Sequence, residues 1–359
     1  MPSAKTSPQI YRIRPLLLSV LLIISSILVL WLHQSRTSLV SHLSDSRQTH
    51  PQYPVDKVAS VAGSFSNPVE IEVQPNTIKA GTIIPYGSGE GQIGIIRGPG
   101  GRPVSGPESF AVGADGSIYL ADALNHRVLV YSNSGELLRS IRISGIGLAD
   151  LTVDRKGNIY VYDDAERSLS QFSSDGSLVT KLLVNAADII SRGYVHIVGE
   201  SVYFANSANS DILIASLRDG VLAAVDLNSD RNSDGIHSAT GKVYSIDVTR
   251  GQTMQIIVHN DSVNLDEQHF AISLPGILSA TYVGEDLKGQ FYIQTERSDG
   301  TAIALEVQKF DMKGQLLATT RMPETDYALG TIKLLDVGND GAIVQFLPQN
   351  NQAKLQMFQ

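Results

Sequence analysis

The sequence predicts an all-β fold, a six-bladed β-propeller, preceded by one transmembrane helix. Two observations predict it: a long uncharged apolar run near the start of the chain, and a unit of short strands and glycine turns that recurs through the rest. A period of about 40–45 residues with about four strands per unit is typical of propellers. The short, β-branched apolar runs argue against helical repeats. The predicted boundaries are 1–15, 16–32, 33–70 and 71–359.

The apolar run from Leu16 to Leu32 reads LLLSVLLIISSILVLWL and carries no charge. A helix of this length spans about 25 Å, near the thickness of a bilayer core. Arg12 and Arg14 precede the run and Trp31 lies at its far end, which predicts a short cytoplasmic tail at 1–15. The alternative is a cleaved signal peptide, although the run ends without the small residues of a cleavage site. In both cases we expect an extracytoplasmic propeller, and the anchor predicts a single-pass protein of the cell membrane.

Residues 33–70 are rich in Ser, His, Gln and Pro and are expected to form a flexible stalk. The chain has 359 residues, no cysteine and a net charge of −8. The lack of cysteine excludes disulfides, thiolate metal sites and a cysteine nucleophile. Because the first segment is cationic, the body is more acidic than the whole chain, which argues against nucleic acid as a partner.

Three segments of the body align with one another: Ala114–Ile141, Arg155–Leu182 and Val198–Val225. Each begins with a turn, followed by an aromatic β-rich run (IYL, IYV or VYF) and a polar turn. A second apolar run and a turn ending in glycine (SNSG, SSDG or LRDG) complete the unit. Strands of about five residues joined by such turns are typical of β-hairpins.

The first turn of this unit recurs roughly every 40–50 residues to the end of the chain. Its six positions are Gly116, Gly157, Glu200, Gly241, Gly289 and Gly341. Six repeats predict six blades. The last repeat lacks a fourth strand, for which TIKAGTIIPY at Thr77–Tyr86 is the candidate. Pairing of this strand with the last blade would close the ring and hide its edges.

The body begins with YGSGEGQ, followed by GPESFAVGADGSIYLADALNHRVLVYSNSG. This stretch resembles the NHL-repeat propellers. In that family a glycine-rich segment and a proline precede the inner strand, which is followed by a glycine turn, an I-Y-[VL]-A-D strand and an N-H-R-[IV] turn. The residues on this motif are Asp122, Asn125, His126, Arg127 and Val128. The match is partial in the second repeat, where AERSL replaces NHRVL, and weak in the others. The resemblance implies the architecture of roughly residues 78–359.

Asp122, Asn125 and Arg127 are either a ligand-facing cluster or a turn, and we favour the turn. In that interpretation Asp122 and Asn125 bond to backbone groups and Arg127 pairs with Asp122. The resemblance also implies a comparison with NHL-like lyases that hold zinc with several histidines. The histidines of the body are His126, His196, His237, His259 and His269. Only His126 lies in the motif turn and the others are taken to lie at dissimilar repeat positions, so a histidine–zinc site is not predicted.

The polar run DLNSDRNSDG contains the candidate metal ligands Asp230, Asn232 and Asp234. Alternate oxygen ligands followed by Gly235 match the first half of a calcium loop. The twelfth position is Gly241 instead of a bidentate glutamate. Two interpretations therefore stay open: a partial Ca²⁺ site and a solvated loop between blades.

Two further parts of the sequence contain residues suited to a site, but neither forms a complete one. Asp150 and Asp154 lie on or beside predicted inner strands, but they do not form the complete set of ligands that lactone-hydrolysing propellers use for a central metal. The glycine-rich RGPGGRP at Arg97–Pro103 lacks the Lys-Ser/Thr ending of a phosphate loop and is expected to connect two blades.

These observations favour a binding or scaffold module whose partner is a protein, a peptide or a cell-wall glycan, because no catalytic set is visible. The alternative is a metal-dependent hydrolase or lyase, lactonase-like or amidating-lyase-like, with a divalent ion in the central channel. A third possibility is a sensor or assembly factor that signals through residues 1–15, a tail too short to form a folded domain. Fold alone does not decide among these functions.

Overall fold

The computed structural model describes residues 78–143, 150–184, 189, 193–206, 209–225, 232–260, 263–323 and 325–359. All of them belong to one of the two compact units of the chain, Glu70–Gln359. The predicted tail, membrane segment Leu16 to Leu32 and stalk lie outside the described residues. Within the described part, no helix has the length and apolarity needed to cross a bilayer.

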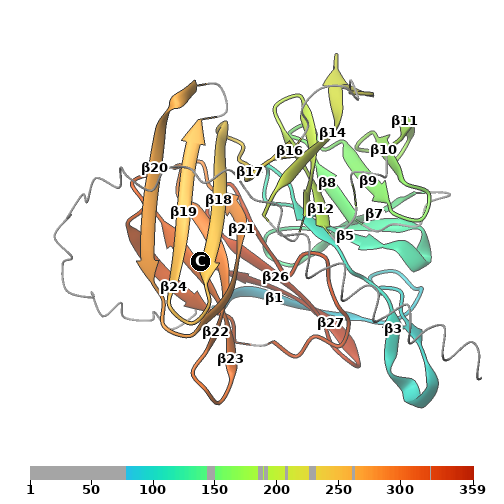
Figure 1. The fold of residues 1–359 in the computed structure, drawn as a ribbon. Helices are drawn as coiled ribbons and strands as arrows, with labels where there is room; N and C mark the ends of the chain where they lie inside the picture. The colour runs from blue at the N-terminus through green and yellow to red at the C-terminus, as the bar shows by residue number, and fades with distance from the viewer. Residues whose placement is uncertain are drawn as a thin grey trace, which may run out of the picture. The chain divides into compact units, whose positions relative to one another are not determined.

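Six antiparallel sheets follow one another along the chain and form the six blades (Figure 1). The first blade contains β4 (Phe110–Val112), β5 (Ile118–Asp122), β6 (Arg127–Tyr131) and β7 (Leu137–Arg142). The second contains β8 (Asp150–Val153), β9 (Ile159–Asp163), β10 (Ser168–Phe172) and β11 (Leu178–Leu183). The third contains β12 (Gly193–Val198), β13 (Ser201–Asn206), β14 (Asp211–Arg218) and β15 (Val221–Ala223), with β16 (Asn232–Ser233) added beside β14. The last three contain β17 (Ile236–His237), β18 (Lys242–Thr249), β19 (Thr253–Asn260) and β20 (Val263–Ser273); β21 (Ile277–Glu285), β22 (Phe291–Ser298), β23 (Ile303–Phe310) and β24 (Leu316–Arg321); and β25 (Leu335–Val337), β26 (Ile343–Pro348), β27 (Gln352–Phe358) and β1 (Ile78–Pro85).

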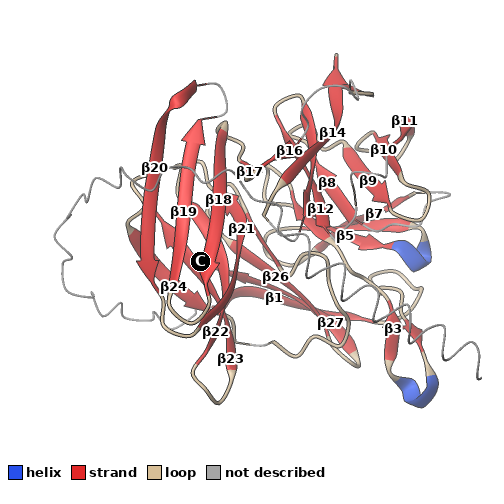
Figure 2. Ribbon diagram, in the orientation of Figure 1, coloured by secondary structure: helices blue, strands red, loops and turns tan. Residues whose placement is uncertain are grey.

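The prediction of an all-β, six-bladed propeller is confirmed by this topology. Figure 2 shows strands throughout the described residues, with helical structure confined to two 3₁₀ turns, η1 (Pro99–Gly101) and η2 (Ala123–Asn125). The glycine-rich Arg97–Pro103 segment forms the tip of a small hairpin of β2 (Ile96–Arg97) and β3 (Pro103–Ser105), which lies in sequence between the sixth and first blades.

The sixth blade is built from both ends of the described chain. Strand β1 pairs antiparallel with β27, so that Ile84 lies opposite Ala353 and Thr82 lies opposite Leu355. The two strands lie side by side in Figure 1, one blue and one red. This pairing covers the edge of β27, which would otherwise present unpaired backbone groups.

A glycine turn joins the two innermost strands of every blade. The glycines with positive φ in these turns are Gly116, Gly157, Gly199, Gly241, Gly289 and Gly341, with φ between 58° and 83°. In the third blade the sequence analysis placed the turn position at Glu200. The residue with positive φ there is the preceding Gly199, because glycine has no Cβ to oppose this conformation. The turn itself lies where it was predicted.

The apolar core lies between blades, because each blade buries both of its faces against its neighbours. Ala111 and Tyr119 of the first blade, for example, pack in one cluster with Leu151 and Val161 of the second. Ile84 and Leu355 of the sixth blade pack with Phe110 of the first. The ring is therefore stabilised mainly by burial of apolar surface at the seams, which acts regardless of the exact side chain.

Two buried aspartates hydrogen-bond across the seams near the inner strands. Asp150 of β8 accepts the Ser109 hydroxyl from the first blade and the Val195 N–H from the third. Asp211 of β14 accepts the N–H of His237 in the fourth blade at 2.7 Å. A carboxylate that accepts backbone N–H groups satisfies donors that burial would otherwise leave unpaired. These contacts fix the positions of the inner strands relative to one another.

Closure of the ring can be tested by two neighbouring isoleucines of β1. Ile84 is fully buried, whereas Ile83 is 60% exposed. We expect Ile84→Ala to lower the free energy of unfolding by about 2–5 kcal/mol, because it opens a cavity in the closing blade. Ile83→Ala is the matched control and should change it by no more than about 0.5 kcal/mol. Urea denaturation of the two variants measures both effects, and equal effects would contradict a role for β1 in closure.

Candidate functional site in the central channel

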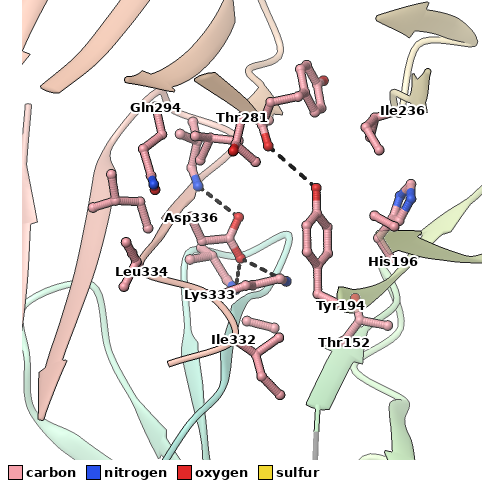
Figure 3. A pocket seen from close by; sticks show the side chains of 18 of the residues that line it. Thr152, Tyr194, His196, Ile236, Thr281, Gln294, Ile332, Lys333, Leu334 and Asp336 are labelled. Atoms are coloured by element: carbon pink, nitrogen blue, oxygen red, sulfur yellow. Dashed lines mark hydrogen bonds and ion pairs between the residues drawn. The ribbon is translucent and has the colours of Figure 1, made fainter. Parts of the chain in front are cut away.

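A cavity of about 580 Å³ lies where the innermost strands of all six blades meet. The innermost strands β4, β8, β12, β17, β21 and β25 each contribute residues to its wall, and much of the remainder comes from the segment 327–334. Figure 3 shows this space with Tyr194 between the Lys333–Asp336 pair and His196. The volume lies within the range that ordinary small-molecule sites occupy.

The segment 327–334 precedes the inner strand of the sixth blade and reaches the first. The Ile332 N–H donates to the Glu108 carbonyl at 2.7 Å, and the Ala328 N–H donates to the Pro348 carbonyl at 2.8 Å. The side chain of Lys333 extends from this segment to the third blade, where its ammonium lies 5.1 Å from the centre of the Tyr194 ring. Because the third and sixth blades are opposite in a six-bladed ring, this contact crosses the channel.

Lys333 lies beside two carboxylates that already have other partners. Its Nζ is 3.7 Å from Asp336 Oδ2, and its side chain is only 10% exposed. Asp336 accepts a hydrogen bond from the Val112 N–H at 3.1 Å and another from the N–H of the next residue, Val337, at 2.8 Å. Burial raises the pKa of Asp150, and attraction to Lys333 offsets this in part. The positive charge of Lys333 is therefore compensated by nearby carboxyl groups.

Two histidines of neighbouring blades share one buried carboxylate. His196 Nε2 lies 2.8 Å from Asp211 Oδ1, and His237 Nδ1 lies 3.0 Å from Asp211 Oδ2. The Tyr203 ring stacks on His237 at 4.2 Å between ring centres and on His196 at 5.6 Å. Asp211 itself is fully buried, while both imidazoles line the cavity.

The ionised state of Asp211 determines how these histidines are oriented. Burial raises its pKa, but attraction to His196 and hydrogen bonds from His196 and His237 outweigh burial and lower the pKa to about 2. An ionised carboxylate only accepts hydrogen bonds, so His196 donates through Nε2–H. In the neutral imidazole Nδ1 is then an acceptor, and a histidine held in this way can take a proton or a hydrogen bond from a bound molecule.

His196, Asp211 and His237 do not converge on one point. Both carboxylate oxygens of Asp211 lie between the two imidazoles and are used by them, so the three groups form a hydrogen-bonded row. Among the described residues, no group of three or more His, Asp or Glu side chains is arranged to hold a metal ion. The described donors of the channel thus do not fit the divalent ion of the hydrolase or lyase alternative.

The residues of the family-like motif are not among those that line the channel. They bind the glycine-rich segment that leads from β1 into the first blade. Asp122 accepts hydrogen bonds from Asn125 and the Gly94 N–H and forms an ion pair with Arg127 at 2.8 Å. Arg127 also donates to the carbonyl oxygens of Gly89 and Gln92. A Cβ at Gly94 would lie 3.0 Å from Asp122 Oδ1 and 2.6 Å from the Leu124 side chain, so only glycine fits. The turn interpretation is borne out by these contacts.

The other predicted candidates are scattered. His126 is exposed directly after η2, and His269 is exposed and pairs with Glu267. His259 lies on β19, outside the channel lining. Asp154 accepts hydrogen bonds within its own turn from Lys156 and Asn158.

Of the calcium candidates, Asp230 and the side chain of Asn232 lie outside the described residues, and Asp234 is exposed. The backbone of Asn232 pairs with Ile212. A Ca²⁺ site at Asp230, Asn232 and Asp234 therefore stays a prediction.

His196 and His237 lie at different places of their repeats, as the sequence predicts. His196 is opposite Tyr203, the tyrosine of its VYF run, whereas His237 is opposite Val243, which corresponds to Val202 of that run. The sequence analysis missed that the fold nevertheless brings the two imidazoles to one carboxylate. No signal in the sequence predicts this, or the places of Asp211, Lys333 and Tyr194, because their positions depend on strands and loops of other blades.

Comparison with known proteins gives one family match. A family described as a domain of unknown function (DUF7485) matches residues 77–276. No curated protein sequence matches the chain.

Solved structures with a similar fold include a member of the DUF4221 family from Bacteroides vulgatus, 10% identical, with a TM-score of 0.46 over 79% of this chain and 98% of that one. A gluconolactonase from Xanthomonas campestris is 15% identical, with a TM-score of 0.42 over 79% of this chain and 100% of that one. Virginiamycin B lyase from Staphylococcus aureus is 10% identical, with a TM-score of 0.39 over 70% and 94%. These likenesses carry no argument about the activity of this chain.

The shared carboxylate predicts a defined acid sensitivity. The folded-state pKa of Asp211, about 2, lies below its ordinary value of 3.8. Its ionisation therefore stabilises the fold above about pH 4, and this contribution, about 2 kcal/mol, is lost as the pH falls towards 2. We expect the stability difference between the wild type and Asp211→Asn to be largest above pH 5 and to shrink towards pH 2. Urea denaturation at several pH values measures it, and a pH-independent difference would contradict the assignment.

Proposed function

The chain belongs to the DUF7485 family, a domain of unknown function matched over residues 77–276, and for it we propose the following function. It is a membrane-tethered extracytoplasmic binding module whose ligand enters the central channel of the propeller. The ligand is a peptide, a glycan or an exposed part of a protein. The membrane segment Leu16 to Leu32 holds the module near the surface, and the residues after it provide reach.

The observation that carries this proposal is the composition of the channel cavity. Apolar side chains such as Val112 and Ile236 form much of its wall, and a small number of polar groups, among them Tyr194, His196 and Lys333, face the same space. An apolar wall with a few fixed polar groups is the usual design of a ligand site, because the apolar part excludes water and the polar part orients the ligand. In this channel Lys333 and Tyr194, from opposite blades, meet.

The alternative, a metal-dependent hydrolase or lyase, requires several carboxylates or imidazoles with free lone pairs around one point. Of the described carboxylates that line the channel, Asp336 accepts a backbone N–H and Glu285 pairs with Lys242. Asp150 and Asp211, near the inner strands, accept backbone N–H groups. This arrangement supports a site that holds a molecule by hydrogen bonds and shape.

The position of the ligand can be tested by photo-crosslinking in intact cells that produce the full chain. Thr281 of β21 lines the cavity, whereas Thr180 lies on the outermost strand β11. We expect a photoreactive phenylalanine at position 281 to give a discrete adduct on illumination, and the same residue at position 180 to give none of that mass.

Identical adducts from both positions, or none from position 281, would contradict a ligand in the channel. If the purified chain instead contained one equivalent of a transition metal, the hydrolase or lyase would replace the binding module as the favoured function.

The topology has its own test. A reporter enzyme that is active only outside the cytosol should be active when fused after Gln359, and deletion of residues 16–32 should abolish that activity by preventing export. A reporter that is active only in the cytosol would disprove the proposed orientation. Recovery of the intact chain in the membrane fraction distinguishes an anchor from a cleaved signal peptide.

A further inference from the structure

Lys333 presents three N–H donors to the channel with no hydrogen-bond acceptor among the described residues. Its side chain is nine-tenths buried, its carboxylate neighbour Asp336 lies 3.7 Å away, and Tyr194 contributes only the face of its ring at 5.1 Å. A buried ammonium is stabilised when oxygen atoms accept its hydrogen bonds. The donors therefore suit a ligand that brings acceptor oxygens to this point.

The charge around Lys333 selects neutral acceptors. Asp336 and the buried Asp150 lie near the ammonium, and the ionised Asp211 holds the two histidines on the other wall. A carboxylate or phosphate that approached Lys333 would also approach Asp336, and repulsion would offset much of its attraction to the ammonium. An oxygen of a hydroxyl or amide group makes the same hydrogen bond without that repulsion.

The other wall requires donors from the ligand. His196 donates to Asp211 through Nε2, and among the described residues its Nδ1 has no partner, so the neutral ring accepts a hydrogen bond there. Thr281 and Gln294 also line the cavity, and each can donate and accept hydrogen bonds. A molecule that fits this surface offers donors and acceptors on several sides, which hydroxyl groups do at every position.

The contact of Lys333 with Tyr194 across the channel favours the end of a glycan over the end of a peptide as the ligand. Lys333 reaches Tyr194 from the opposite blade, so a chain molecule that enters the cavity places its end against this pair. A free peptide ends in a carboxylate or an ammonium. At this ion pair a carboxylate is attracted by Lys333 but repelled by Asp336, and an ammonium is attracted by Asp336 but repelled by Lys333, so each gains less than it would at a single charge. A sugar unit at the end of a glycan is uncharged, and a cavity of about 580 Å³ has room for it.

We propose that the channel binds the end of a neutral saccharide, with Lys333 donating hydrogen bonds to its oxygen atoms and His196 accepting one from a hydroxyl group. This inference rests on the proposed function and names the class of its ligand. Lys333 provides most of the selectivity, because its donors face the cavity and the Asp336 carboxylate beside it repels anions.

Binding by the full chain in lipid nanodiscs tests the proposal. The neutral probes are maltose and N,N′-diacetylchitobiose, the anionic probes are galacturonic acid and inorganic phosphate, and triglycine represents a peptide with charged ends. We expect isothermal titration to detect binding of a neutral disaccharide in preference to the other probes. Lys333→Met should weaken that binding about 10- to 100-fold, because one or two charge-assisted hydrogen bonds are lost.

Lys309→Met is the matched control, because Lys309 also lies over a tyrosine ring, Tyr292 at 5.3 Å, but outside the cavity. It should leave binding unchanged, and Lys333→Arg, which keeps the charge and the donors, should weaken binding less than Lys333→Met. Thermal unfolding of each variant verifies that it is folded.

Tighter binding of phosphate, galacturonic acid or triglycine would overturn the proposal, as would a neutral disaccharide that binds Lys333→Met unchanged or the absence of any saccharide binding. A crosslinked adduct at position 281 together with any of these results would leave the binding module standing and reject only the saccharide.

Discussion

The pairing of β1 with β27 is the constraint on which the rest of the structure depends. A propeller blade buries both faces against its neighbours, so the first and last blades must meet for either to be complete. Here the last blade is finished by a strand from the other end of the domain, and Ile84 of that strand packs with Phe110 of the first blade. Only a closed ring brings the six inner strands around one axis and creates the channel.

Within the channel, the same side chains hold the ring together and shape the site. Asp336 bonds to Val112 across one seam and lies beside Lys333. Asp211 bonds to the backbone of His237 across another seam and orients two imidazoles. Because these carboxylates accept backbone N–H groups, their positions are fixed by the same contacts that hold the blades together. The stability of the ring and the arrangement of polar groups in the channel are therefore physically linked.

The polar motif that suggested the family resemblance has a different role. Asp122 and Arg127 hold the glycine-rich approach between β1 and β4 through Gly94, Gly89 and the Gln92 carbonyl. This approach is the segment that carries the chain from the closing strand into the first blade. The motif thus supports closure of the ring. Its polar residues are concentrated in the first repeat, because this repeat follows directly on the segment that they bind.

The sequence by itself determined the fold class, because glycine turns and short strands are local features that recur with a readable period. The turns at Gly116 and Gly157, the candidate closing strand and the turn role of Asp122 all follow from residues near one another in the chain. The channel was decided by tertiary structure alone. Lys333 meets Tyr194 because closure brings opposite blades together, and Asp211 meets two histidines because the third and fourth blades pack side by side. A repeat pattern does not specify which side chains meet at these places. His196 and His237 also belong to this second case, because they lie at different places of their repeats and only the fold brings them to one carboxylate.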